Sequence, residues 1–140
     1  MTTVTVSEDI NASADKVWGA LSDFGGIKVG GPVTSFECDG DGVGMIRTIG
    51  LGGGKVVERL DRHDADALLF AYSIINEDCP LPVANYSATV LITPTGSDRC
   101  NVNWSGTFEP KGASEAEAVK LVESIYRGGI AGARQSLGAG

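Results

Sequence analysis

The stretch from residue 33 to residue 109 most constrains the fold, because it alternates short apolar runs with turn residues and shows no helical period. The runs span residues 35–38, 44–49, 56–60, 68–75, 86–93 and 102–108. Residues 39–42, 52–54, 63–66 and 94–98 separate them, are rich in Gly, Asp or Pro, and suit hairpin connections. The pattern predicts an antiparallel meander.

A strand and a short helix are predicted before this meander. Polar residues Thr3, Thr5 and Ser7 alternate with Val4 and Val6, which is typical of a strand with one buried face. Ser13 then offers an N-cap. The residues that follow with the spacing of one helical face are Ala14, Val17, Trp18 and Leu21.

A long helix is predicted after the meander. Ser114, with Glu117 three residues later, forms a capping box, and an apolar stripe begins at Ala118. Three glycines at 128, 129 and 132 each cost about 1 kcal/mol inside a helix. Two interpretations remain open: the helix bends or stops near Gly128 and a second segment covers 130–137, or the missing side chains leave volume for a ligand.

Together these elements predict one α+β domain over residues 1–140. A curved antiparallel sheet of about seven strands wraps around a long C-terminal helix, with one or two short helices after the first strand. With 42% hydrophobic residues, the chain builds a core without disulfides. The glycine-rich stretch 25–32 is predicted to be a loop or a broken helix, and a lid over the mouth of the cavity is one interpretation that stays open.

Composition argues against several classes of partner. The net charge of −7 repels nucleic acid, and no apolar run approaches the length of a membrane span, so we expect no membrane insertion and a cytoplasmic protein. Three cysteines without a C-x-x-C pair indicate reduced thiols. The single His63 disfavours a multi-histidine metal site, and residues 50–55 lack the spacing of a phosphate loop, so we expect no metal and no cofactor.

Five local strings, in their order and spacing, resemble the START/Bet v 1-like (SRPBCC) superfamily and its polyketide cyclase/dehydrase branch of helix-grip domains. The strings cover residues 4–18, 42–49, 72–77, 85–90 and 100–104. The resemblance implies a cavity between sheet and helix that holds a small hydrophobic or aromatic ligand. Locally the chain is similar to lachrymatory factor synthase, a sulfenic acid isomerase.

That resemblance implies a catalytic pair, Arg47 and Glu77. If they are paired in a dry pocket, Arg47 holds a ligand oxygen and Glu77 acts as general acid/base; the alternative is that each reaches solvent from a strand end. Tyr72 and Tyr86 add phenol groups, which are also common core residues. The complete set expected to bind the ligand is Tyr72, Tyr86, Trp104, Ile49, Ile75, Ala88, Phe108 and Ile125.

Three functions follow from these expectations. The first is a cofactor-free cyclase, dehydratase or isomerase that uses Glu77 and Arg47. The second is a non-catalytic carrier or sensor of a hydrophobic metabolite such as a lipid or polyketide. The third is a module whose apolar rim contacts another protein. We expect a monomer or a weak homodimer.

Overall fold

The computed structural model describes residues 1–26 and 29–139. It contains two helices, α1 (Ala14–Leu21) and α2 (Glu115–Leu137). Its strands are β1 (Thr2–Ile10), β2 (Val33–Asp39), β3 (Ile46–Leu51), β4 (Gly54–Asp64), β5 (Leu69–Ile74), β6 (Val83–Gly96) and β7 (Arg99–Pro110). The predicted α+β order of elements is confirmed.

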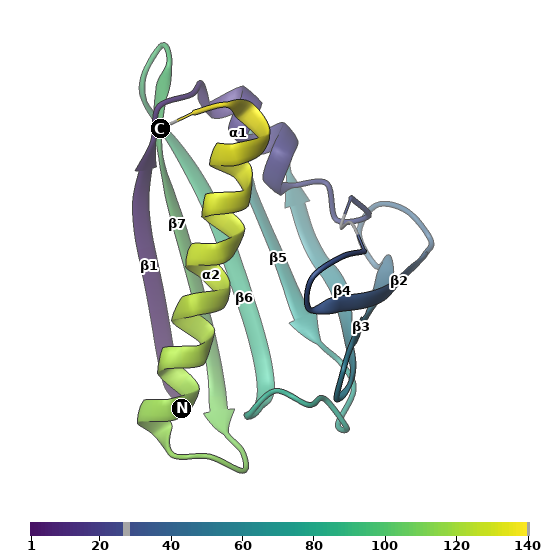
Figure 1. Ribbon diagram of the computed structural model, residues 1–140. Coiled ribbons are helices and arrows are strands. Elements are labelled where there is room, and N and C mark those ends of the chain that lie inside the picture. Colours follow the sequence, from purple (N-terminus) through teal and green to yellow (C-terminus); the bar gives the residue numbers. More distant parts are fainter. Residues whose placement is uncertain (27–28, 140) are drawn as a thin grey trace.

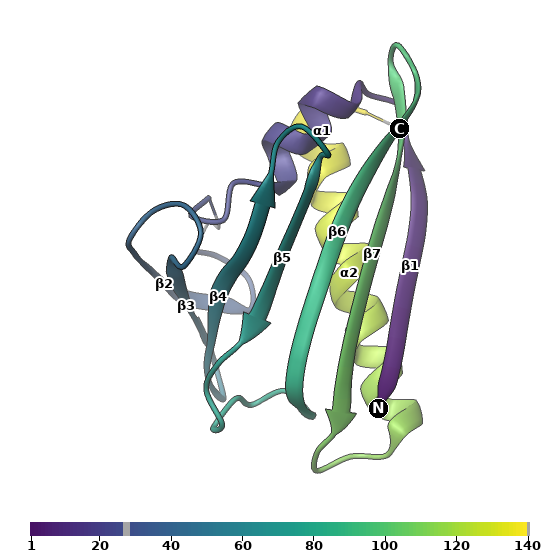
Figure 2. The same ribbon diagram turned by 180° about the vertical axis from the view of Figure 1, so that it is seen from behind.

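The strands form a single antiparallel sheet in the order β1-β7-β6-β5-β4-β3-β2. Helix α2 lies diagonally across the part of the sheet formed by β1, β7 and β6, with α1 near its C-terminal end (Figure 1). Seen from behind, the sheet stands in front of both helices, so the two helices share one face (Figure 2). This arrangement confirms the predicted helix-grip architecture.

The core lies between α2 and the concave face of the sheet. Along β7, Val102, Trp104 and Phe108 are buried, whereas Asn103 and Thr107 on the other face remain half-exposed. Helix α2 buries a stripe that faces this strand, formed by Ala118, Val122, Tyr126, Ile130 and Ala133. The period-two pattern therefore placed the inward residues of β7 correctly. The stripe predicted for α2, which comprised Ala118, Leu121, Val122 and Ile125, was right only in part, because Ile125 is exposed and Tyr126 is buried in its place.

Both predicted N-caps are present. The Ser13 side chain accepts a hydrogen bond from the Lys16 amide, and Ser114 accepts one from the Glu117 amide. These bonds satisfy amides that the first turn of a helix leaves without a partner.

Helix α2 runs unbroken through its three glycines, so the interpretation of a break near Gly128 is wrong. Gly129 is required by packing, because a Cβ atom there would approach Cζ3 and Cη2 of Trp104 to 2.6 and 2.8 Å. A Cβ at Gly128 or Gly132 would meet open space. The space that Gly129 leaves is thus filled by the Trp104 indole, whose burial favours the continuous helix.

In the described part of the chain, neither helix is long and apolar enough to cross a membrane. Residues 27 and 28, within the stretch interpreted as a lid, lie outside the described residues.

Candidate functional site

A buried ion pair on the concave face joins Arg47 of β3 to Glu58 of β4. The two residues are cross-strand partners. Nε and Nη2 of Arg47 both lie 2.7 Å from Oε1 of Glu58, and the side chains are only 13% and 9% exposed. Arg47 is thus held at one carboxylate by a hydrogen bond from Nε and a close ionic contact of Nη2.

The guanidinium of Arg47 has further partners that fix its position. It lies 3.8 Å from the ring centroid of Phe24 and 5.5 Å from that of Tyr72. Its Nη1 donates to the Phe24 carbonyl oxygen at 3.2 Å. Burial raises the pKa of Glu58, while the charge and hydrogen bond of Arg47 act in the opposite direction. Arg47 therefore holds Phe24, which follows α1, against the sheet.

The structure does not bring Arg47 and Glu77 together as a pair. Within the described residues, the only carboxylate in an ion pair with Arg47 is that of Glu58. Glu77 lies beyond the end of β5, where it is exposed. The expected partner of Arg47 is corrected to Glu58, because the β3–β4 hairpin sets these two residues side by side on the inner face.

A cavity of about 480 Å³ opens where β5 and β6 separate. The two strands pair from Leu69 with Leu91 as far as Ser73 with Ser87. Beyond this point β6 is irregular, and Asn85 adopts a positive φ of 52°. The cavity is lined by Ile74, Ile75, Asn76, Glu77, Val83, Ala84, Asn85, Tyr86 and Lys111.

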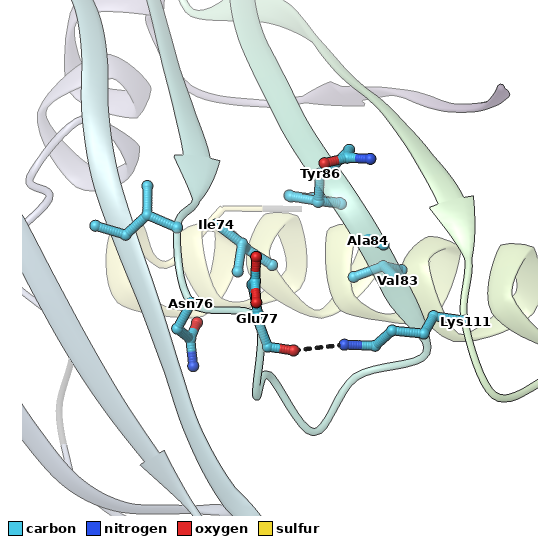
Figure 3. Close-up of a pocket in the computed structure, with 9 residues that line it drawn as sticks. Ile74, Asn76, Glu77, Val83, Ala84, Tyr86 and Lys111 are labelled. Atoms are coloured by element: carbon cyan, nitrogen blue, oxygen red, sulfur yellow. Dashed lines mark hydrogen bonds between the residues drawn. The ribbon is translucent and has the colours of Figure 1, made fainter.

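Charged groups stand at this cavity beside apolar ones. Figure 3 shows Lys111, which follows β7, extending toward Glu77, which follows β5. The Lys111 ammonium donates to the Glu77 backbone oxygen at 2.7 Å. Ile74, Val83 and Ala84 supply apolar surface. This combination suits a ligand with an apolar body and a polar or charged end.

Inward from the cavity lies a chain of hydrogen-bonded aromatic side chains. The indole Nε1 of Trp104 donates to the Tyr72 hydroxyl at 3.2 Å, and the Tyr72 hydroxyl lies 3.4 Å from that of Tyr86. The Tyr86 hydroxyl is also hydrogen-bonded to that of Tyr126. The pKa values of all three phenols are raised, mainly by burial. The pKa of Tyr126 rises to about 12. The phenols therefore remain neutral at physiological pH.

A second cavity of about 380 Å³ lies at the opposite end of β4. Its lining includes Phe24, Met45, Leu60 and His63. Leu60 pairs with Tyr72 in the sheet register, whereas the first cavity borders Ile74, which pairs with Glu58. The layer of Tyr72, Arg47 and Glu58 thus lies between the two cavities. Across the described residues, no cluster of three or more His, Cys, Asp or Glu side chains is arranged to hold a metal ion.

The residues expected to bind the ligand lie in different surroundings. Ile75 and Tyr86 line the first cavity, together with Glu77, which was expected to be catalytic. Tyr72 and Trp104 belong to the aromatic chain. The other four residues lie elsewhere, two in the core, one on β3 and one on α2. Ala88 and Phe108 are buried, Ile49 is half-buried and Ile125 is exposed.

Sequence reasoning missed Glu58 and Tyr126, although a signal existed for each. Glu58 shares the inward parity of Val56 and Leu60, and the two-residue turn at Gly52 and Gly53 sets Arg47 opposite it. Tyr126 lies four residues after Val122, on the buried stripe of α2. A charged or phenolic side chain at an inward position was the available sign of a polar site.

Comparison with known proteins gives matches over nearly the whole chain. The model of the family described as polyketide cyclase / dehydrase and lipid transport matches residues 1–138. No curated protein sequence matches significantly.

Several solved structures share the fold. XoxI from Bacillus cereus is 30% identical with a TM-score of 0.83, over 97% of this chain and 95% of that one. An uncharacterized Bacillus thuringiensis protein is 30% identical with a TM-score of 0.82, over 96% and 98% of the respective chains. Norcoclaurine synthase from Thalictrum flavum, solved in complex with dopamine and hydroxybenzaldehyde, is 25% identical with a TM-score of 0.73, over 97% of this chain and 85% of that one.

Proposed function

The chain belongs to the polyketide cyclase / dehydrase and lipid transport family, and we propose that it binds a small aromatic or similarly apolar molecule in the cavity between β5 and β6. Membership in this family supports hydrophobic ligand binding in general. The separation of the two strands beyond Ser73 and Ser87 supports the more specific proposal, because a cavity lies where their pairing ends.

The size and lining of the cavity favour a compact ligand. A volume of about 480 Å³ falls within the usual range for small-molecule sites. Ile74, Val83 and Ala84 contact the apolar body, while Glu77 and Lys111 remain near the opening for a polar end. Norcoclaurine synthase, which resembles this chain, was solved with two small aromatic compounds, dopamine and hydroxybenzaldehyde. Ligands of this size and chemistry are the first to test.

Binding is tested by blocking the cavity. We expect benzaldehyde, 4-hydroxybenzaldehyde or dopamine, at about 100 times its dissociation constant, to raise the unfolding midpoint by about 10 °C. Ala84→Phe fills the cavity and should abolish this shift. Thr89→Phe, on the same strand but outside the cavity, is the matched control and should retain it. Equal shifts in both variants would place the ligand elsewhere.

A second candidate function is acid–base catalysis by Glu77. The observation that favours it is that Glu77 lines the cavity. A carboxylate beside a bound carbonyl compound can remove or return a proton without a metal. Arg47 has a different role in this proposal: its hydrogen bonds to Glu58 and Phe24 make it a positioning residue, not a ligand anchor.

Product analysis separates the enzyme from the carrier. If Glu77 is the general acid/base, Glu77→Gln should leave ligand affinity nearly unchanged and abolish turnover. If the protein is a carrier, the wild type returns every ligand chemically unchanged. Glu37→Gln, at an exposed carboxylate of β2 outside the cavity lining, is the control for the change of charge. A loss of turnover in both variants would argue against a specific role of Glu77.

A further inference from the structure

The aromatic chain contains three tyrosines, and one of them, Tyr86, also lines the cavity. Tyr86 comes from β6, Tyr72 from the neighbouring β5, and Tyr126 from α2. All three are at most 7% exposed. Their hydroxyls therefore meet within the core, and Tyr86 connects this group to the lining of the proposed ligand site.

This network contains more polar hydrogen atoms than hydrogen bonds between its members. Three phenols and the Trp104 indole carry four polar hydrogens, and three hydrogen bonds join the groups. Among the described residues, these four side chains make no other hydrogen bond. One phenolic hydrogen is thus left without an acceptor, which is unfavourable in a buried site.

Tyr86 is the phenol best placed to offer that hydrogen. Its hydroxyl has two phenol neighbours, and a phenol oxygen accepts two hydrogen bonds while donating one. When Tyr72 and Tyr126 both donate to Tyr86, the Tyr86 hydrogen is free to point to a ligand. Donation by two neighbours also polarises the Tyr86 hydroxyl and makes it a stronger donor.

Two glycines make this arrangement possible. At Gly106 on β7, a Cβ would collide with the Tyr126 hydroxyl. At Gly129 on α2, a Cβ would collide with Trp104, which stacks on Tyr126 with ring centroids 5.1 Å apart. The backbone thus leaves room for the polar ends of these aromatic residues within the core.

From this geometry we infer that Tyr72, Tyr86 and Tyr126 form a recognition site for a ligand oxygen, and that the cavity selects molecules with a carbonyl or phenolic oxygen at their inner end. The inference rests on the proposed function and names its ligand class. Burial keeps the phenols neutral, so they act as donors. Tyr86 contacts the ligand, while Tyr72 and Tyr126 position and polarise it.

The test uses benzaldehyde and styrene, which have similar shapes but differ in the acceptor oxygen. Calorimetry on the wild type should give about 10-fold tighter binding of benzaldehyde, the upper range for one neutral hydrogen bond. Tyr86→Phe should remove most of this preference without weakening styrene. Thr107→Val removes a hydroxyl on the other face of the sheet and should change neither affinity.

Infrared spectroscopy provides an independent measurement. In the wild type, the carbonyl stretch of bound benzaldehyde should shift to lower wavenumber than that of benzaldehyde without a hydrogen bond. The shift should be smaller in Tyr126→Phe and should disappear in Tyr86→Phe. A structural role of Tyr86 alone would not change this frequency. Circular dichroism verifies that each variant is folded.

The outcomes separate this inference from the proposed function. Equal affinity of the wild type for the two probes, or an unchanged preference in Tyr86→Phe, overturns the recognition site. If both probes still bind and Ala84→Phe blocks them, the cavity function stands. If neither binds to the wild type, binding of a small aromatic molecule is overturned together with the inference.

Discussion

Arg47 and Glu58 face each other across the β3–β4 hairpin, with two guanidinium nitrogens 2.7 Å from the same carboxylate oxygen. The pair lies on the inner face of the sheet, beneath the Phe24 ring. It therefore joins the hairpin to the segment that follows α1, where Phe24 lies.

The first prediction concerns the cost of breaking this pair. Glu58→Gln should lower the free energy of unfolding by about 3 kcal/mol, because it leaves a buried guanidinium without its counter-charge. The double variant Arg47→Met, Glu58→Leu should lose less than the sum of the single changes. Urea unfolding measures both.

An exposed ion pair on the same strand is the control. Arg59 and Asp61 are 48% and 30% exposed, so Arg59→Gln should cost less than about 1 kcal/mol. Equal losses at the buried and the exposed pair would show that burial does not determine the contribution of Arg47 and Glu58.

The second prediction separates the three glycines of α2. Gly128→Ala and Gly132→Ala should each stabilise the protein by up to about 1 kcal/mol, because alanine has the higher helix propensity and meets no other atom. Gly129→Ala should destabilise it, because the new methyl group collides with Trp104. Thermal unfolding of the three variants is the measurement, and stabilisation by Gly129→Ala would contradict the packing described.

The third prediction concerns alkaline pH. The folded-state pKa of Tyr126 is raised from 10.0 to about 12, and those of Tyr72 and Tyr86 are raised further. Their contribution to stability is complete below the unfolded pKa near 10 and is lost as pH rises through the folded values. Tyrosinate absorbance should therefore show no step near pH 10 in the folded protein and should appear together with unfolding at higher pH. A separate step at pH 10, with the circular dichroism spectrum unchanged, would contradict this.

The fourth prediction concerns the attachment of α2 to β1. Glu8 accepts hydrogen bonds from Arg127 at 3.0 Å and from Arg134 at 2.7 Å. Glu8→Gln should weaken both and increase amide hydrogen exchange in the last turns of α2 more than in its first turns. Glu123→Gln, which affects only a long i,i+4 contact with Arg127 at 3.6 Å, is the control and should leave the pattern unchanged.

Local patterns in the sequence were sufficient to predict the elements and their order. Period-two alternation identified β1, and hairpin residues separated the strands of the meander. Ser13 and Ser114 marked where the helices begin. These features act within a few residues of the chain, so they do not depend on the final packing.

To predict the partner of Arg47, one has to count residues across the β3–β4 hairpin. Strand parity puts Arg47 on one face with Met45 and Ile49, but parity does not say which residue lies opposite. The two-residue turn at Gly52 and Gly53 fixes that register and brings Glu58, not Glu77, beside Arg47. Glu77 lies past the end of β5, where strand parity no longer applies.

By itself, the sequence determined the fold class, because hydrophobic periodicity and turn chemistry are local properties, and the family was indicated by the resemblance of five local strings. Only the tertiary structure decided that α2 continues through Gly129 and that Tyr126 meets Tyr72 and Tyr86. Both outcomes depend on packing between residues far apart in the chain: Trp104 fills the space beside Gly129, and Gly106 makes room for the Tyr126 hydroxyl. Such long-range packing leaves no periodic signal in any single segment.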